Sequence, residues 1–275
     1  MKSLYISDLD GTLLNKNIEV TQFSKDIINK FIQGGGYFSV ATARTLDTAL
    51  PLIDGLNINA PVISLNGVAI YDTVKKEYEK IEIIQKDSAA NLFNLLAENN
   101  ITGFVHALEN GNIIFFYENL NAPHRKKFHD DRVNKYKRIY TKVNSFAELL
   151  DRNIIYFSTC DEYEKLIHIS ELIKQDNNLN VEFYRDVYWT DFWYMEVSSV
   201  NASKYNGIKY LREKYGFEHI VCFGDNLNDL PMFEASDEQY AVNNAKDEVK
   251  SKAVAIIGSN EDDGVAKFIE QKIKE

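Results

Sequence analysis

Two aspartates separated by one residue, Asp8 and Asp10, have the clearest capacity for chemistry in this chain. They follow a short apolar run, 4–6, that is typical of a β-strand, and Gly11 and Thr12 come directly after them. Asp and Gly also favour ordinary turns, so a turn without function is the simplest alternative. The strand has to end here, however, so both carboxylates can turn towards one site. Two carboxyl groups held in different protonation states could divide nucleophilic and acid–base work between them.

Polar residues also follow two later apolar runs. Thr42 comes after the run 37–41, and Asp225 and Asp229 come after the run 219–223. In open parallel sheets, ligands bind outside the carboxyl ends of the strands. We therefore expect these residues to share one site with the first two aspartates.

An acidic cluster of Asp8, Asp10 and Asp225 is unstable unless it is paired, protonated or occupied by a cation. Oxygen ligands favour a hard ion, and carboxylates together with a substrate phosphate favour Mg²⁺. Such an ion would also reconcile an anionic substrate with the net charge of −10. Lys204 is the candidate for balancing a transferring phosphoryl group, and Thr42 offers a hydroxyl. Taken alone, this lysine would be a solvated surface residue and this threonine a helix N-cap.

The segments that position these residues alternate between strand and helix at both ends of the chain. This alternation predicts an α/β fold, with a Rossmann-like parallel-sheet core formed by residues 1–84 and 190–275. Its expected strands are 4–6, 37–41, 61–65, 219–223, 239–242 and 253–257, and its expected helices are 21–32, 46–53 (kinked at Pro51), 205–215, 230–235, 245–252 and 264–273. An outgoing strand pair is expected at 69–71 and 80–84.

Residues 85–189 are predicted to form a separate α+β unit inserted between the two halves of the core. The mixed order of helices and strands favours an antiparallel sheet with helices on one face. The expected helices are 88–99, 122–133, 145–150 and 162–174, and the expected strands are 103–107, 112–117, 153–159, 181–184 and 194–198. Trp189 and Trp193 are interpreted as packing residues, with contact to substrate as the alternative.

Composition excludes several classes of function. The acidic net charge of −10 argues against nucleic acid or an anionic membrane as the main partner. No apolar run approaches the ~18–20 residues needed to span a bilayer, and no signal peptide is evident. Cys160 and Cys222 lie in apolar contexts and are expected to be buried free thiols. A cytoplasmic protein is expected.

In order and spacing, these motifs resemble those of the haloacid dehalogenase-like (HAD) phosphohydrolases, and specifically the Cof-type branch with its inserted C2 cap. The matching motifs are Asp8-Leu-Asp10-Gly-Thr-Leu, Ala41-Thr42-Ala43-Arg44, Lys204, Gly224-Asp225-Asn226-x-Asn228-Asp229, Leu65-Asn66-Gly67, Ala241-Val-x-Asn-Ala245 and the tail from Ser259 to Ala266. Ala43 and Tyr205 stand where the family most often has glycine. The resemblance covers both halves of the core and implies that residues 85–189 are the inserted α+β cap that sets substrate specificity. The cap itself carries little motif signal.

The resemblance implies a Mg²⁺-dependent phosphatase that cleaves small phosphate monoesters, sugar phosphates first, through an aspartyl-phosphate intermediate. Asp8 would be the nucleophile, and Asp10 would act as acid and then as base, with Thr42 and Lys204 assisting. The other implied roles are phosphate contacts by Leu9, Thr42, Ala43, Asn66, Lys204 and Asn228, metal ligation by Asp8, the Asp10 carbonyl, Asp225 and Asn226, and support of Lys204 by Asp229. The implied partner is a small phosphorylated metabolite.

Two alternatives to a phosphatase remain. A phosphotransferase or phosphomutase would use the same Asp8 intermediate but pass the phosphoryl group to a second substrate. A phosphate-sensing protein without turnover could share the acids, the threonine and the lysine, since receiver domains also contain such residues.

Overall fold

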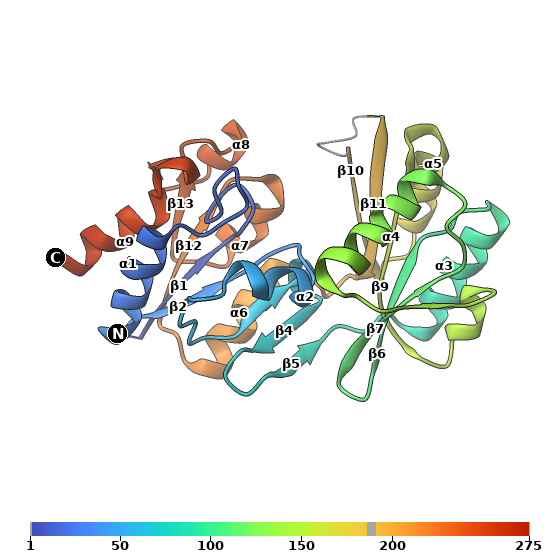
Figure 1. Ribbon diagram of the computed structural model, residues 1–275, viewed down its shortest axis with the longest axis horizontal. Helices are drawn as coiled ribbons and strands as arrows, with labels where there is room; N and C mark the ends of the chain where they lie inside the picture. The colour runs from blue at the N-terminus through green and yellow to red at the C-terminus, as the bar shows by residue number, and fades with distance from the viewer. Residues whose placement is uncertain (1, 186–190, 275) are drawn as a thin grey trace. The chain divides into compact units, whose positions relative to one another are not determined.

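The structure is a computed structural model that describes residues 2–185 and 191–274 (Figure 1). The chain forms two compact units, one of residues 1–80 with 203–275 and the other of residues 81–202. Each unit has its own cluster of buried apolar side chains. Trp189 lies outside the described residues.

The first unit is built on a five-stranded parallel sheet in the order β14-β13-β12-β1-β2. The central strand β1 contributes Leu4 and Ile6, which are fully buried. Strands buried on both faces are expected to be apolar, and that explains why these runs stood out in the sequence. The strands are β1 (Ser3–Ser7), β2 (Tyr37–Val40), β12 (His219–Gly224), β13 (Glu238–Val242) and β14 (Ala255–Ile257). The predicted α/β fold with a parallel-sheet core is confirmed.

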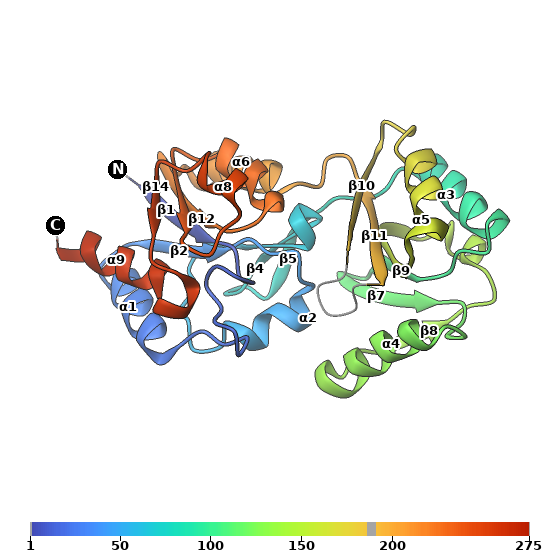
Figure 2. The same cartoon turned by 90° about the horizontal axis from the view of Figure 1, so that it is seen from above.

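Helices cover both faces of this sheet, with α1 and α9 on one face and α6 and α8 on the other (Figure 2). The Thr21 hydroxyl accepts a hydrogen bond from the Ser24 N–H, so Thr21 is the N-cap of α1 as predicted. Helix α2 gives way to a 3₁₀ turn over Leu50–Leu52 at Pro51, where a kink was expected. The helices are α1 (Gln22–Gln33), α2 (Leu46–Ala49), α6 (Lys204–Tyr215), α7 (Leu230–Glu234), α8 (Asp247–Lys250) and α9 (Gly264–Lys274).

A smaller sheet, β3-β4-β5, continues the first unit. Its strands are β3 (Val62–Ser64), β4 (Ala69–Asp72) and β5 (Glu77–Ile81). The Ala41–Ile63 bridge links it in parallel to the end of β2. The strand predicted at 80–84 is wrong beyond Ile81, because the outgoing strand begins and ends earlier.

The second unit contains a six-stranded sheet in the order β10-β11-β9-β6-β7-β8. Its pairs are antiparallel except for β7 with β8, a short strand that the sequence did not suggest. The strands are β6 (Phe104–Glu109), β7 (Asn112–Tyr117), β8 (Tyr140–Lys142), β9 (Asn153–Glu162), β10 (Leu179–Arg185) and β11 (Phe192–Ser199), and the helices are α3 (Lys86–Glu98), α4 (Pro123–Tyr136) and α5 (Tyr163–Ile173). The helix predicted at 145–150 is a 3₁₀ turn over Phe146–Leu149.

Helices lie on both faces of the second sheet, so the prediction of helices on one face is wrong. Helices α3 and α5 pack on the face that carries Val105, whereas Phe128 of α4 stacks on Phe104 of the opposite face. Successive strand residues point to opposite faces, which explains this separation. On the α3–α5 face, Trp193 stacks on Phe183 and contacts Tyr163, so its predicted packing role is confirmed.

The boundaries of the inserted unit differ from those predicted. The sequence placed them at 84/85 and 189/190, whereas the compact units meet at 80/81 and 202/203. Strand β11 pairs with both β9 and β10, so residues 192–199 belong to the inserted sheet and not to the core. Residues 200–202, which follow β11, end the inserted unit.

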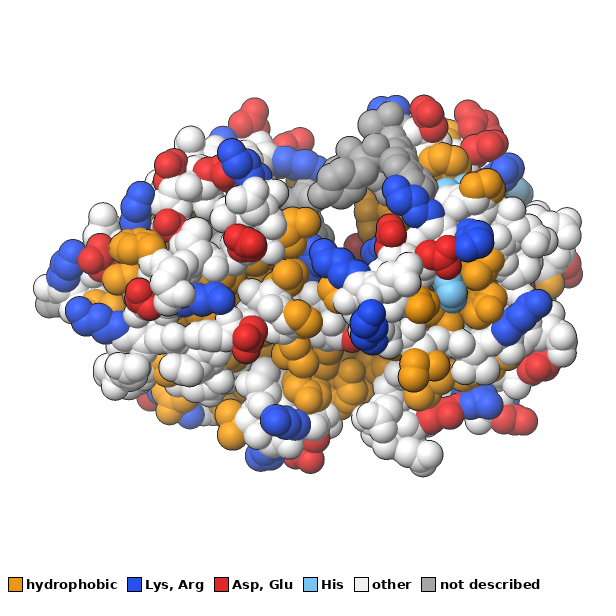
Figure 3. All heavy atoms as spheres, in the orientation of Figure 1, with side chains coloured by type: hydrophobic (Ala, Val, Ile, Leu, Met, Phe, Trp, Pro, Cys, Tyr) orange, Lys and Arg blue, Asp and Glu red, His pale blue; other side chains and the backbone are white. Residues whose placement is uncertain are grey.

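Acidic and basic side chains are interspersed over the described part of the face in Figure 3. No helix of the described residues is both long enough and apolar enough to cross a membrane. Cys160 and Cys222 are buried, and neither forms a disulfide, as predicted.

Candidate active site

The loop after β1 is folded back on its own main chain. The Leu9 carbonyl accepts hydrogen bonds from the N–H groups of Thr12, Leu13 and Leu14, at 3.3, 3.1 and 2.8 Å. Gly11 has a φ of +80°, a conformation that glycine adopts without strain. The loop therefore leaves the strand in a fixed conformation, with Asp8 buried at its start.

A second loop, after β12, lies beside the first because β1 and β12 are paired neighbours, with Ser7 opposite Phe223. Its first turn is closed by a capping box between Asn226 and Asp229. Asp229 Oδ2 accepts the N–H groups of Asp225 and Asn226 at 2.9 and 3.0 Å. The two loops are joined by the Thr12 hydroxyl, which donates to Asp225 Oδ1 at 2.8 Å.

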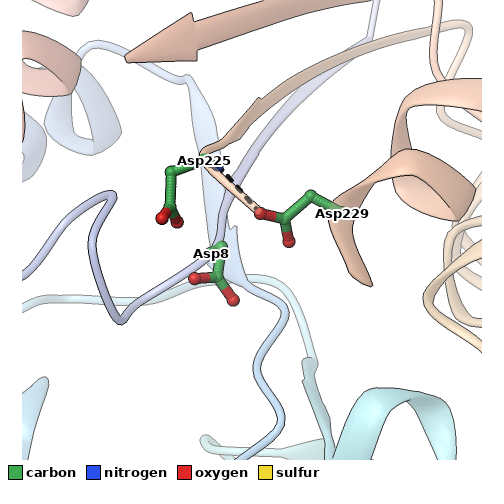
Figure 4. A group of neighbouring side chains, drawn as sticks. All are labelled: Asp8, Asp225 and Asp229. Carbon is green, nitrogen blue, oxygen red and sulfur yellow. Dashed lines mark hydrogen bonds between the residues drawn. The ribbon is translucent and has the colours of Figure 1, made fainter. Parts of the chain in front are cut away.

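The three carboxylates of Asp8, Asp225 and Asp229 are neighbours in the structure (Figure 4). Each offers an oxygen atom within 4.8 Å of an oxygen of the others. Asp8 comes from the end of β1, whereas the other two come from the loop after β12. The cluster thus joins parts of the chain more than 200 residues apart in sequence.

Lys204, the first residue of α6, supplies the buried cation of the site. Its Nζ lies 2.6 Å from Asp8 Oδ1 and 2.7 Å from Asp229 Oδ1, and its side chain is fully buried. Burial alone would disfavour the ammonium charge, but Asp229 and Asp8 outweigh it and raise the pKa of Lys204. Two of the three ammonium donors are used in these contacts, which leaves one for a ligand.

One lysine does not neutralise three carboxylates. Burial raises the pKa of Asp8 well above its usual value, with Lys204 opposing that shift. Burial, followed by the charge of Asp229, raises the pKa of Asp225 to about 6. The ionised cluster would carry two uncompensated negative charges. A hard divalent cation matches both this deficit and the all-oxygen donor set.

Asp10 stands apart from this cluster. Its carboxylate is held by Arg44, with Oδ2 2.6 Å from Nε and Oδ1 2.6 Å from Nη2. This is the bidentate geometry in which a guanidinium fork meets a carboxylate. The side chain of Asp10 is about half exposed, whereas that of Arg44 is 21% exposed.

Thr42 and Asn66 lie in the loops after β2 and β3, and Asn228 lies in the loop after β12. Thr42 is buried, and its hydroxyl accepts the Arg44 N–H at 3.1 Å, so it shapes this turn and does not cap α2. Asn66 has a left-handed conformation, and its N–H donates to the Thr42 carbonyl at 3.0 Å. The side-chain nitrogen of Asn228 lies 3.4 Å from Asn66 Oδ1.

The structure brings together Asp8, Asp225, Asp229 and Lys204, all of which the sequence predicted for one site. The Asn226 side chain is used locally, since its Oδ1 accepts the Leu227 N–H at 2.8 Å. Of the phosphate contacts expected from the family, the Leu9 side chain is fully buried, and Ala43 is exposed.

Three contributors were not given roles from the sequence: Arg44, Thr12 and Asn244. Asn244 donates to the Gly11 carbonyl at 2.7 Å and so fixes the acidic loop. One feature of the sequence could have pointed to Arg44. It is a cation two residues after Thr42, and the strands that end nearby are followed by aspartates. The other two contacts cross between loops, and spacing along the chain gave no indication of them.

Comparison with known proteins shows the family of this chain. The family model for haloacid dehalogenase-like hydrolases matches residues 5–269. The chain belongs to the haloacid dehalogenase-like hydrolases.

Curated relatives within this family match nearly the whole chain. A pyridoxal phosphate phosphatase of Escherichia coli is 25% identical over 95% of both chains. A 5-amino-6-(5-phospho-D-ribitylamino)uracil phosphatase of Bacillus subtilis is 27% identical over 98% of both chains. A solved haloacid dehalogenase-like hydrolase from Bacteroides thetaiotaomicron has a TM-score of 0.80 at 23% identity, covering 99% of this chain and 100% of its own. This haloacid dehalogenase-like hydrolase is a phosphatase, as the sequence predicted, and the sensing alternative without turnover is set aside.

Proposed function

We propose that the enzyme hydrolyses small phosphate monoesters, with sugar phosphates and similar phosphorylated metabolites as its substrates, and that it requires Mg²⁺. The observation that carries this proposal is the charge deficit around Asp8, Asp225 and Asp229, which Lys204 compensates only in part. Relatives named for pyridoxal phosphate and for a phosphoribityl compound support a small phosphorylated metabolite as substrate.

Asp8 is the proposed nucleophile. Lys204 engages Asp8 Oδ1, so Oδ2 is the oxygen to attack phosphorus. The bond from phosphorus to the leaving-group oxygen breaks as the Asp8–phosphorus bond forms, and Asp10 gives its proton to the leaving oxygen. Asp10 then removes a proton from water, which attacks phosphorus and returns Asp8 to its carboxylate with release of inorganic phosphate.

The remaining residues hold the phosphoryl group and the metal. Asp8, Asp225 and the Asp10 main-chain carbonyl are the proposed Mg²⁺ ligands, with Asn226 at the edge of the site. The ion would neutralise the charge on the phosphoryl oxygens. Lys204, Thr42, Ala43, Asn66, Asn228 and the Leu9 main chain are the proposed phosphate contacts, and Asp229 keeps Lys204 in place.

The first experiment is a screen for phosphate release from a panel of metabolite phosphates in the presence of Mg²⁺. The panel includes pyridoxal phosphate and sugar phosphates. Asp8→Asn is expected to lower turnover by about 10⁴-fold or more, because the nucleophile is lost. Asp54→Asn makes the same chemical change at an exposed position and should leave turnover unchanged. Near-normal activity of the Asp8 variant would disprove the nucleophile assignment.

Removal of the metal gives an independent test. EDTA should abolish phosphate release, and added Mg²⁺ should restore it, because the ionised acids cannot hold a phosphate dianion without a cation. An enzyme that keeps its full rate in EDTA would contradict the proposed metal site.

A phosphotransferase remains the second candidate, because the same Asp8 intermediate would serve it. Stoichiometric transfer to an added sugar without release of inorganic phosphate would favour it over hydrolysis. Mass measurement of the peptide containing Asp8, after trapping, would show the shared intermediate in either case.

A further inference from the structure

We propose that Arg44 is a positioning residue that orients the Asp10 carboxylate for proton transfer. This inference rests on the proposed role of Asp10 as acid and base. Each carboxylate oxygen accepts one hydrogen bond from the guanidinium, at 2.6 Å, so Arg44 sets the plane of the carboxylate. Each oxygen keeps a second lone pair, which can carry the proton that is transferred.

Asp10 needs such a partner more than the other acids of the site. Asp8 and Asp229 are buried and held by Lys204, and Asp225 is held by the Thr12 hydroxyl. The Asp10 side chain is half exposed. An exposed carboxylate samples several rotamers, and proton transfer depends on correct orientation.

The main chain on both sides of the contact is fixed. The Arg44 N–H donates to the Thr42 hydroxyl at 3.1 Å, and the Arg44 carbonyl accepts the Leu65 N–H at 3.0 Å. The loop around Asp10 is closed by the hydrogen bonds to the Leu9 carbonyl and by Asn244. Because the main chain is fixed around both Arg44 and Asp10, the guanidinium contact determines how the Asp10 carboxylate is oriented. Lysine cannot reproduce this, because it lacks the planar fork.

The test uses the dependence of the rate on the leaving group. An alkyl phosphate needs a proton on its leaving oxygen, whereas p-nitrophenyl phosphate leaves readily without one. The ratio kcat/KM covers the steps up to departure of the leaving group. It would be measured on both esters for the wild type, Arg44→Gln, Arg44→Lys, Asp10→Asn and the Arg44→Gln/Asp10→Asn double variant.

Arg44→Gln is expected to lower kcat/KM for the alkyl ester by about 10–100-fold, within the range that general acid catalysis supplies, and for the aryl ester by less than about threefold. Arg44→Lys should lie between the wild type and Arg44→Gln. In the Asp10→Asn background, Arg44→Gln should cause no further loss, since its effect acts through that carboxylate.

Several results would overturn the inference. An equal loss on both esters would mean that Arg44 binds the common phosphate or supports the fold. Full additivity with Asp10→Asn would also remove the link between the two residues. A faster Arg44→Gln enzyme would mean that the contact restrains Asp10. If Asp10→Asn itself showed no dependence on the leaving group, the proposed role of Asp10, and not only that of Arg44, would fail.

Discussion

The ionisation of Glu196 in β11 is expected to affect the stability of the inserted unit, residues 81–202. It is partly buried and lies directly across from Glu182 of β10. The hydroxyls of Tyr156 and Tyr184 hydrogen-bond to it, and Arg132 of α4 is the nearby cation. Burial first, and then the charge of Glu182, raise the pKa of Glu196 to about 7.

The raised pKa predicts a pH-dependent stability of the inserted unit. The folded state keeps a proton on Glu196 that the unfolded chain releases above its ordinary pKa of 4.5, so this group's contribution to stability falls as the pH rises towards about 7. Glu196→Gln should therefore gain about 3 kcal/mol in free energy of unfolding relative to the wild type between pH 4 and pH 8. Tryptophan fluorescence during urea unfolding would measure it, because Trp189 and Trp193 both belong to residues 81–202.

Glu98→Gln makes the same chemical change at an exposed position of α3 and serves as the control. Its difference from the wild type measures the effect of the same chemical change at an exposed site. A Glu196→Gln difference that varies no more with pH than that of Glu98→Gln would show that Glu196 titrates as an ordinary glutamate in the folded protein.

At the scale of elements, the loop after β1 depends on the lack of a side chain at Gly11. A Cβ there would lie 2.5 Å from Asp225 Oδ2, and the φ of +80° already disfavours other residues. Gly11→Ala should displace Asp225 and lower Mg²⁺ affinity and turnover by about tenfold or more, in the range reported for disturbed metal-site partners. A Mg²⁺ titration of phosphate release measures both effects.

Gly111→Ala is the matched control for this loop. Gly111 has a φ of +77°, but a Cβ there would meet no atom within 4 Å. It therefore carries the backbone strain without the clash, and its Mg²⁺ dependence should match that of the wild type. If the two variants had the same Mg²⁺ dependence, contact between Gly11 and Asp225 would not be the cause.

The elements around the site could be predicted because each signal was local. The apolar strands, the Thr21 cap and the polar residues at strand ends follow from periodicity and turn chemistry. The Arg44–Asp10 pair could not be predicted, because it depends on side-chain reach between two loops. The end of the inserted unit was also missed, since only strand pairing shows that β11 belongs to it.

At the scale of the whole molecule, the chain leaves its core after β5 and returns to it at α6. The core unit, residues 1–80 and 203–275, has its own buried apolar cluster, separate from that of residues 81–202. Asp8, Lys204, Asp225 and Asp229 all belong to the core unit. The acidic cluster proposed to bind the metal, and the lysine beside it, thus lie entirely outside the inserted residues.

This organisation predicts that the core unit folds by itself. Replacing residues 81–202 with a flexible Gly/Ser linker of about ten residues should give a protein that unfolds cooperatively, followed by circular dichroism. Mg²⁺ should raise its melting temperature, since a ligand at 100 times its Kd adds about 2.7 kcal/mol to stability. Asp225→Asn in the same shortened protein is the control and should lose that response.

A shortened protein without a cooperative transition would mean that the core needs the inserted unit to fold. If the shortened protein folds but Mg²⁺ does not raise its melting temperature, while Mg²⁺ does raise that of the intact enzyme, the inserted unit completes the metal site.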